Sequence, residues 1–466
     1  MKLGMRLLAA NGLRWIALTT FAFFCTGWDI ARAGSLDIEQ AVAKARQQNP
    51  DIQIAQKKLQ AARAGIKEAR AGTLPSVVST GTARKREQQA DSRLRSNDYN
   101  ASVRVVQSVY SGGEVGSRLA IARLNVEKTE LEYQSVVDRV TMEVRVAFDE
   151  LLLNRSKTRV RTEAVDVLKQ ELKTQTERLG VGTVGELNVR RAEVTLATEQ
   201  PELIAAQSLV KNSYLRLGEL LALPAKESGF EAAGELRYQT RLPALNECLV
   251  RAERSRPEIR SREIDVEIED QQLLLDRSDL RPHVDVFSGY EIYNERDPQV
   301  GQEFNHGYVV GVNGSWKIFD GFATKGRVEA TRARRDAAVL ALEAEKRAVE
   351  SDVRSAFLDL QQAESVLHAQ TKTVETADQS LEIAKGNLTA GLGTQLEVFQ
   401  AATDITRART TRLSAIYLHN VALARLAKAC ATDTATLSFA NKAAAETAND
   451  HRVFDVAQPP PKLTWQ

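Results

Sequence analysis

The sequence predicts a mainly α-helical protein that contributes a few β-strands to a transmembrane barrel and is built by duplication of one unit. Three observations support this fold class. Landmark residues recur later in the chain, short segments alternate apolar and polar residues, and two very long proline-free stretches have apolar residues at helical spacing. Each unit is expected to contain a helix, two strands, a very long helix and a returning helix, in that order.

The first 33 residues read as a signal peptide. Lys2, Arg6 and Arg14 precede an apolar stretch at 15–24, and the small residues around Ala33 form the pattern of a cleavage site. Cleavage after Ala33 is expected to export the chain. The alternative is an uncleaved anchor helix, but the apolar stretch is shorter than the about 20 residues that a spanning helix needs.

The residues near Cys25, the net charge and the remaining cysteines limit the kinds of protein that the mature chain can be. A lipoprotein is disfavoured because the bulky Phe23 and Phe24 precede Cys25. Loss of the signal peptide turns the formal charge of +2 into about −1, so no nucleic-acid partner is expected. Cys248 and Cys430 remain, and whether they pair or stay as two buried thiols is open.

Five landmarks define the duplication. The run at 49–52 (Asn-Pro-Asp-Ile) recurs at 256–259 (Arg-Pro-Glu-Ile), and the other pairs keep an offset of 207 or 209. These pairs are Pro75 with Pro282, Tyr110-Ser111-Gly112 with Phe319-Asp320-Gly321, Phe148 with Phe357, and Gly182 with Gly391. We therefore divide the chain into a first repeat at 34–223, an equatorial linker at 224–242, a second repeat at 243–430, and an equatorial segment with a mobile tail at 431–466.

Four strands are predicted from alternation with a period of two. They lie at about 76–86, 99–110, 283–293 and 308–319. About ten residues of apolar-out and polar-in alternation are typical of a transmembrane barrel strand. The segment at 76–86 is rich in Ser, Thr and Gly and is assigned mainly through its repeat partner.

Aromatic residues lie near the ends of these strands, as residues at a membrane interface do. Tyr110, Trp316 and Phe319 are the candidates on the side of the long helices. Polar segments at 87–98 and 294–307 separate the strands of each pair and are expected to be external loops. Hairpins of a soluble sheet are the alternative that alternation alone leaves open.

Two long helices are predicted at about 113–179 and 322–388. Apolar residues recur at helical spacing, and towards the far end the spacing becomes seven, which indicates a coiled-coil seam. The seam residues are Leu367, Val374, Leu381 and Leu388, mirrored by Val165, Leu172 and Leu179. About 67 residues at 1.5 Å each make a rod of roughly 100 Å.

Glycine-rich turns end both long helices. Gly180, Gly182 and Gly185 follow the first, and Gly391 and Gly393 follow the second. The first cluster also spells G-x-G-x-x-G, but a dinucleotide-binding motif must follow a buried strand, and this one follows a helix. Returning helices are expected at 186–223 and 395–429. They are shorter than the long helices, so leading helices at about 36–72 and 243–279 are expected to stack end to end with them.

The chain resembles the TolC family of outer-membrane factors. The resemblance rests on the order and duplication of these elements and on the run Gly-Leu-Gly-Thr-Gln-Leu-Glu-Val-Phe-Gln-Ala at 391–401, and it extends over about 36–430. It implies a homotrimer with one twelve-stranded barrel in the outer-membrane lipid and a helical coiled-coil tunnel through the periplasm. It also implies two partners, a periplasmic adaptor and an inner-membrane pump, which engage the tip of the tunnel.

An oligomer is expected on physical grounds as well. Four strands cannot close a barrel, and an open sheet edge in lipid leaves backbone groups unsatisfied at a cost of several kcal/mol each. Two, three or four copies would all give permitted strand numbers. Only the resemblance selects three.

The resemblance places a gate at the two glycine turns. Alignment of the repeats puts Asn188 and Glu397 at matching positions in the returning helices, and family members often carry acids there. Glu397 comes three residues after Thr394 of the second glycine turn. Three copies of Glu397 would favour cations. The pattern is incomplete, because Asn188 and Gln400 are neutral. The simpler interpretation is that Glu397 is an acid in the first turn of a helix, favoured by the helix dipole.

Rival functions are weaker. The five His residues are scattered, and we expect no catalytic site, cofactor or metal. A periplasmic coiled-coil adaptor or scaffold without a pore is the main alternative, although it has no need of strands with aromatic ends. The expected function is an exit duct for efflux or type I secretion, and the sequence does not distinguish small molecules from proteins as substrates.

Overall fold

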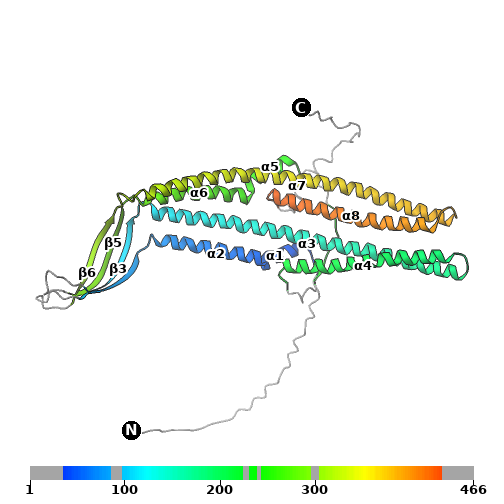
Figure 1. The fold of residues 1–466 in the computed structure, drawn as a ribbon, viewed down its shortest axis with the longest axis horizontal. Helices are drawn as coiled ribbons and strands as arrows, with labels where there is room; N and C mark the ends of the chain where they lie inside the picture. The colour runs from blue at the N-terminus through cyan, green and yellow to red at the C-terminus, as the bar shows by residue number, and fades with distance from the viewer. Residues whose placement is uncertain (1–34, 86–96, 224–229, 239–242, 295–303, 433–466) are drawn as a thin grey trace, which may run out of the picture.

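The computed structural model describes residues 35–85, 97–223, 230–238, 243–294 and 304–432, and shows a long helical rod with a β-sheet at one end (Figure 1). The predicted signal peptide with Ala33, most of both external loops, most of the linker and the tail after 432 lie outside the described residues. Within them the order helix, strand, strand, long helix and returning helix occurs twice, as predicted.

The first repeat contains α1 (Ile38–Gln48), α2 (Pro50–Ala71), β2 (Ser76–Lys85), β3 (Asn97–Tyr110), α3 (Glu114–Gly180) and α4 (Glu186–Leu220). The second contains α5 (Leu245–Ser255), α6 (Pro257–Ser278), β5 (His283–Asn294), β6 (Phe304–Ser315), α7 (Ala323–Thr389) and α8 (Gln395–Ala429). Two short strands, β1 (Ser35–Leu36) and β4 (Glu231–Ala232), pair in parallel beside α3. Among the described residues, no helix is both long enough and apolar enough to cross a membrane.

The prediction of one continuous leading helix in each repeat is wrong. Asn49 and Arg256 adopt extended backbone angles between two helices, because a residue before proline is driven away from the helical region. Asn49 then caps α2, since its side chain accepts a hydrogen bond of 2.9 Å from the backbone N–H of Asp51. The Asn-Pro-Asp landmark is thus a helix break and a new helix start.

The end of the fourth strand also differs from the prediction. β6 stops at Ser315, which pairs with His283, the first residue of β5. The residue before His283 is Pro282, which has no N–H to continue the ladder. Trp316 and Phe319 therefore lie in the connection to α7, where the Trp316 indole N–H donates a hydrogen bond of 3.0 Å to the Leu280 carbonyl oxygen.

Each long helix is flanked along its length by shorter helices, as predicted: the broken leading helix covers one part and the returning helix covers the other. α2, α1 and α4 pack on α3, while α6, α5 and α8 pack on α7 (Figure 1). α3 also contacts α6 and α8, which joins the two repeats side by side. The largest core lies near the middle of the rod around Phe148, Leu151 and Leu217, and a second core surrounds Val353, Leu360 and Leu426.

A partly buried carboxyl group lies in this middle region. Burial raises the pKa of Asp149 on α3 to about 6, although a hydrogen bond from Asn420 and the charge of Arg145 both lower it. The folded pKa is above that of the unfolded chain, so the folded state binds the proton more tightly. Stability is therefore gained as the pH falls through about 6 and is lost as it rises.

We expect the Asp149→Asn variant to be more stable than the parent at pH 7.5, because it removes the cost of burying a charge. A rise from 3.8 to about 6 corresponds to at most about 3 kcal/mol. Thermal melting of the detergent-solubilised protein at pH 7.5 and pH 4.5 measures this difference. Asp166→Asn, an exposed acid on the same helix, is the matched control and should change neither value. Equal melting temperatures for Asp149→Asn and the parent at pH 7.5 would contradict the expectation.

Candidate functional site

The four-stranded sheet has one apolar face. Its order is β2-β3-β5-β6 with all neighbours antiparallel, and the register brings apolar residues of neighbouring strands together, such as Val77 with Val105, and Val286 with Val312. The same face carries Val103 beside Tyr290. Many of these side chains are exposed in the single chain: Val77, Val103, Val105, Val286, Tyr290, Ile292, Tyr308, Val310 and Val312. This is the surface that a lipid-facing strand pair requires.

Aromatic residues border this face at both ends. Tyr290 and Tyr308 pack edge to face at 5.1 Å near the loop end. At the helix end, a bulge between Ser108 and Tyr110 places Tyr110 opposite Val284, and so on the apolar face. Tyr308 lies in β6 and Trp316 directly follows its last residue, so the two are eight residues apart, which is about 27 Å of extended backbone and about 20 Å along the axis of a tilted barrel. That separation fits the height of a membrane band.

The opposite face of the sheet is polar. Arg104 forms an ion pair of 2.9 Å with Glu291, and its guanidinium lies 5.3 Å from the centre of the Phe287 ring. Two glycines make room for this cluster: a Cβ on Gly289 would clash with Arg104, and a Cβ on Gly311 would lie 2.6 Å from the Phe287 ring. Sequence reasoning missed this cluster, because only the strand register brings Arg104, Phe287 and Glu291 together.

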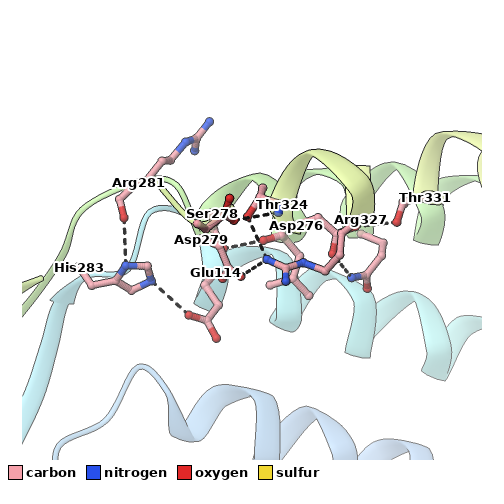
Figure 2. A network of polar contacts seen from close by, with 12 residues as sticks. Glu114, Asp276, Ser278, Asp279, Arg281, His283, Thr324, Arg327 and Thr331 are labelled. Atoms are coloured by element: carbon pink, nitrogen blue, oxygen red, sulfur yellow. Dashed lines mark hydrogen bonds and ion pairs between the residues drawn. The ribbon is translucent and has the colours of Figure 1, made fainter. Parts of the chain in front are cut away.

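Polar contacts surround the junction between the sheet and the helices (Figure 2). Asp276 at the end of α6 accepts hydrogen bonds from Thr331 of α7 at 2.6 Å and from Gln272 at 2.8 Å. Glu114 at the start of α3 lies 3.4 Å from the Nε2 atom of His283 at the start of β5. The contact between Glu114 and His283 therefore links the long helix of the first repeat to a strand of the second repeat.

The first glycine turn closes the α3–α4 hairpin. Gly182 has a φ of +73°, which glycine adopts without strain, and the backbone N–H of Thr183 donates to the Arg178 carbonyl oxygen at 2.9 Å. Gly180 is the last residue of α3, and Gly185 is the cap residue before α4. Asn188 lies in the first turn of α4, where its N–H donates to the Gly185 carbonyl oxygen.

The second turn closes the α7–α8 hairpin in the same way. Gly391 has a φ of +74°, and Thr394 and Glu397 form a reciprocal capping box at the start of α8. The Thr394 N–H donates to Glu397 at 3.2 Å, and the Glu397 N–H donates to Thr394 at 3.4 Å. A Cβ on Gly393 would lie 2.9 Å from the Glu397 carboxylate. The Glu397 carboxylate thus has a local capping contact, while Gln400 is exposed on α8.

A link between the hairpins was not predicted. Glu171 of α3 accepts hydrogen bonds from Gln395 of α8 at 2.6 Å and from Gln175 at 2.7 Å. Phe399 of α8 packs against Leu168 of α3 and Ala192 of α4 close by. The one available sequence signal was Gln175, a polar residue three positions after Leu172 of the predicted seam.

The capping contact allows the charge of Glu397 to be tested separately from its structural role. Glutamine also serves in a capping box, so Glu397→Gln keeps the cap and removes the charge, whereas Glu397→Ala removes both. If Glu397 sets cation selectivity in planar bilayers, we expect both variants to reduce it. Unchanged selectivity in Glu397→Gln would exclude that role, and a loss of about 1 kcal/mol of stability in Glu397→Ala alone would then remain as its contribution.

Within the described residues, no group of three or more His, Cys, Asp or Glu side chains could hold a metal ion. Cys248 and Cys430 are both buried and unbridged in the second core.

Comparison with known proteins agrees with this arrangement. The family model described as outer membrane efflux protein matches residues 41–223 and 248–432, one segment in each repeat. A search of curated proteins finds no match.

Solved structures of outer-membrane channels share the fold. The outer-membrane channel OprN is 19% identical, with a TM-score of 0.73 over 85% of this chain and 90% of that chain. VceC of Vibrio cholerae is 16% identical, with a TM-score of 0.72 over 85% and 96%. The CmeC channel of Campylobacter jejuni is 15% identical, with a TM-score of 0.71 over 86% and 88%. Because the family model matches most of the chain and both repeats, this chain belongs to the outer membrane efflux protein family.

Proposed function

We propose that three copies of the chain form one outer-membrane channel, with a twelve-stranded barrel in the membrane and a helical tunnel in the periplasm. The observation that carries this proposal is the four-stranded sheet with its apolar face. In the described part of the chain, the outer edges of β2 and β6 pair with no other strand. Backbone groups on such edges cost several kcal/mol each in lipid, so sister copies must complete the sheet. The number three comes from the family resemblance.

The channel is proposed to serve as the exit duct of a tripartite efflux or type I secretion system. The long helices each contain 67 residues and would extend about 100 Å from the sheet, far enough to meet partners across a compartment. The two tips present exposed apolar residues, Val181 and Leu392, to such partners. We propose a periplasmic adaptor and an inner-membrane pump as these partners, and a gate at the tips. The choice between small molecules and proteins as substrates depends on the pump.

Membrane association and pore activity test the channel directly. The protein should stay in envelopes during a carbonate wash, leave them only with detergent, migrate as an oligomer that heating dissociates, and conduct ions in planar bilayers. Release by carbonate as a monomer without conductance would overturn the channel. That result would favour the alternative, a periplasmic coiled-coil scaffold without a pore.

A further inference from the structure

Phe322, the residue that precedes α7, has an unusual backbone conformation. Its φ is +67°, a left-handed conformation that costs a non-glycine residue about 1–2 kcal/mol, and its side chain is 68% exposed. The equivalent residue of the first repeat, 209 positions earlier, is Gly113, with a φ of +99°. The second repeat thus places a large apolar side chain where the first has the residue that fits without strain. Such an outlier points to a function for the side chain.

Within the chain, the turn before α3 is covered by the second repeat. A Cβ on Gly112 would lie 2.7 Å from the Cβ of Arg281, and the Arg281 guanidinium donates to the Gly112 carbonyl oxygen at 2.9 Å. In the second repeat, a Cβ on the equivalent Gly321 would meet no atom within 4 Å. The residue equivalent to Arg281, 207 positions earlier, is Leu74, which is 58% exposed beside edge strand β2. Among the ring contacts of the described residues, Phe322 packs within one chain only edge to face against the similarly exposed Phe319 at 5.4 Å, and Leu74 lies open to solvent.

The helices next to these turns also contain positions that lie at a contact within the chain in one repeat and are exposed at the equivalent place in the other repeat. Ion pairing of Lys128 with Asp265 at 2.6 Å and hydrogen bonding of Ser135 with Glu258 at 3.4 Å set the register of α3 on α6. This register places Leu131 level with Arg262, one residue from Ser261, and Arg262 itself pairs with Glu345 of α7. The residues equivalent to Leu131 and Ser261 are Leu340 on α7 and Ile54 on α2, which are 65% and 55% exposed. A second pair of exposed apolar residues thus follows from the same duplication.

We infer that Phe322 and Leu340 of one copy pack against Leu74 and Ile54 of the next copy. This contact repeats between copies the α3–α6 contact made within the chain, and the inference rests on the proposed oligomeric channel. Because each contact joins a second repeat to a first repeat, it is directional, and such a contact forms a ring when the rotation between copies closes, as the proposed barrel requires.

The residues at the contact within the chain differ from those at the inferred contact between copies, and this difference supports the inference. The contact within the chain places Gly113 beside Arg281 and Leu131 within one residue of Ser261, and the covalent chain already holds its two sides together. The contact between copies matches only apolar residues, whose burial supplies association energy at about 25 cal/mol per Å². Burial of the Phe322 side chain by the next copy would also offset the cost of its left-handed backbone.

Cysteine pairs test the contact. Leu74→Cys with Phe322→Cys, and Ile54→Cys with Leu340→Cys, are made in a background with Cys248→Ala and Cys430→Ala, and treated with a short bismaleimide in native outer membranes. Leu74 and Phe322 lie beside opposite edges of the sheet, so a link between them joins two copies. We expect covalently linked dimers and trimers on denaturing gels for each pair, and none for the four single variants.

The outcomes separate this inference from the proposed channel. A heat-dissociable oligomer with conductance but no cross-link in either pair would overturn the inference and leave the channel intact. Labelling of Phe322→Cys in that oligomer by a maleimide dissolved in the lipid would also overturn it, because the side chain would then face the membrane. Absence of any oligomer or conductance in the parent protein would instead overturn the channel.

A substitution gives an independent measurement. We expect Phe322→Ala to lower the association constant of the copies roughly tenfold or more, seen as dissociation of the detergent-solubilised oligomer at lower temperature. Ile318→Ala is the matched control, since Ile318 is an exposed apolar residue of the same connection that has no place in the repeated contact. Equal dissociation temperatures for the two variants would overturn the inference.

Discussion

Replacement of Gly289 by valine will prevent the two hairpins of the sheet from pairing, so the variant will form no heat-stable oligomer in the outer membrane. Gly289 lies on β5 opposite Arg104 of β3, at the seam where the first repeat meets the second. A Cβ there would collide with the Val103 carbonyl oxygen and lie 2.9 Å from the Cα of Arg104. Backbone atoms cannot turn away as a side chain can, so we expect a cost of at least about 3 kcal/mol, the upper end of typical overpacking.

The variant also displaces the Arg104 side chain, which contacts Phe287 and pairs with Glu291. Gly81→Val is the matched control, since a Cβ on Gly81 of β2 would meet no atom within 4 Å. Outer-membrane fractions run on denaturing gels with and without heating measure the oligomer. Normal oligomer in Gly289→Val, or equal loss in Gly81→Val, would contradict the prediction.

Phe148→Ala should lower the stability of the chain by about 3–5 kcal/mol, as expected for removal of a fully buried phenylalanine. Phe148 of α3 is 1% exposed and lies in the largest core with Val144 and Leu151. Its repeat partner Phe357 on α7 is only partly buried against the second core. Phe357→Ala is therefore the natural control, and we expect no more than about half the effect.

Thermal unfolding of both variants, followed by helical circular dichroism in detergent, measures the difference. A similar loss in the two variants would mean that a neighbouring copy buries Phe357 in the assembled protein. Phe148 and Phe357 occupy equivalent positions in the two repeats. A difference between the two stability losses would therefore come from their different packing and not from their place in the repeat.

Much of the fold followed from periodicity and duplication. The order of the elements and the stacking of short helices beside each long one could be predicted because helix and strand periods are properties of the sequence itself. The helix breaks at Asn49 and Arg256 were missed, although each of these residues precedes a proline. Helical spacing of apolar residues on both sides of each proline favoured one continuous helix. The end of β6 at Ser315 was not readable, because it depends on Pro282, which directly precedes the neighbouring strand β5.

The candidate site was less accessible from the sequence. The glycine turns were found because glycine with a positive φ leaves a local signature. The Arg104–Glu291 pair and the Glu171–Gln395 link involve residues 187 and 224 positions apart, so only the tertiary structure brings them together. The roles of Asn188, Glu397 and Gln400 in a gate remain predictions for the experiments above.

The equal dimensions of the two repeats have a mechanical consequence. α3 and α7 have the same number of residues, 67, and α4 and α8 also match at 35. In the proposed ring of copies, all hairpins would then end at one level and form a flat rim. Insertion of about seven residues into each helix of one hairpin, in one repeat alone, would raise alternate hairpins by about 10 Å and leave a notched rim. Length matching between the repeats is therefore a constraint that acts on the chain even where individual side chains are free to change.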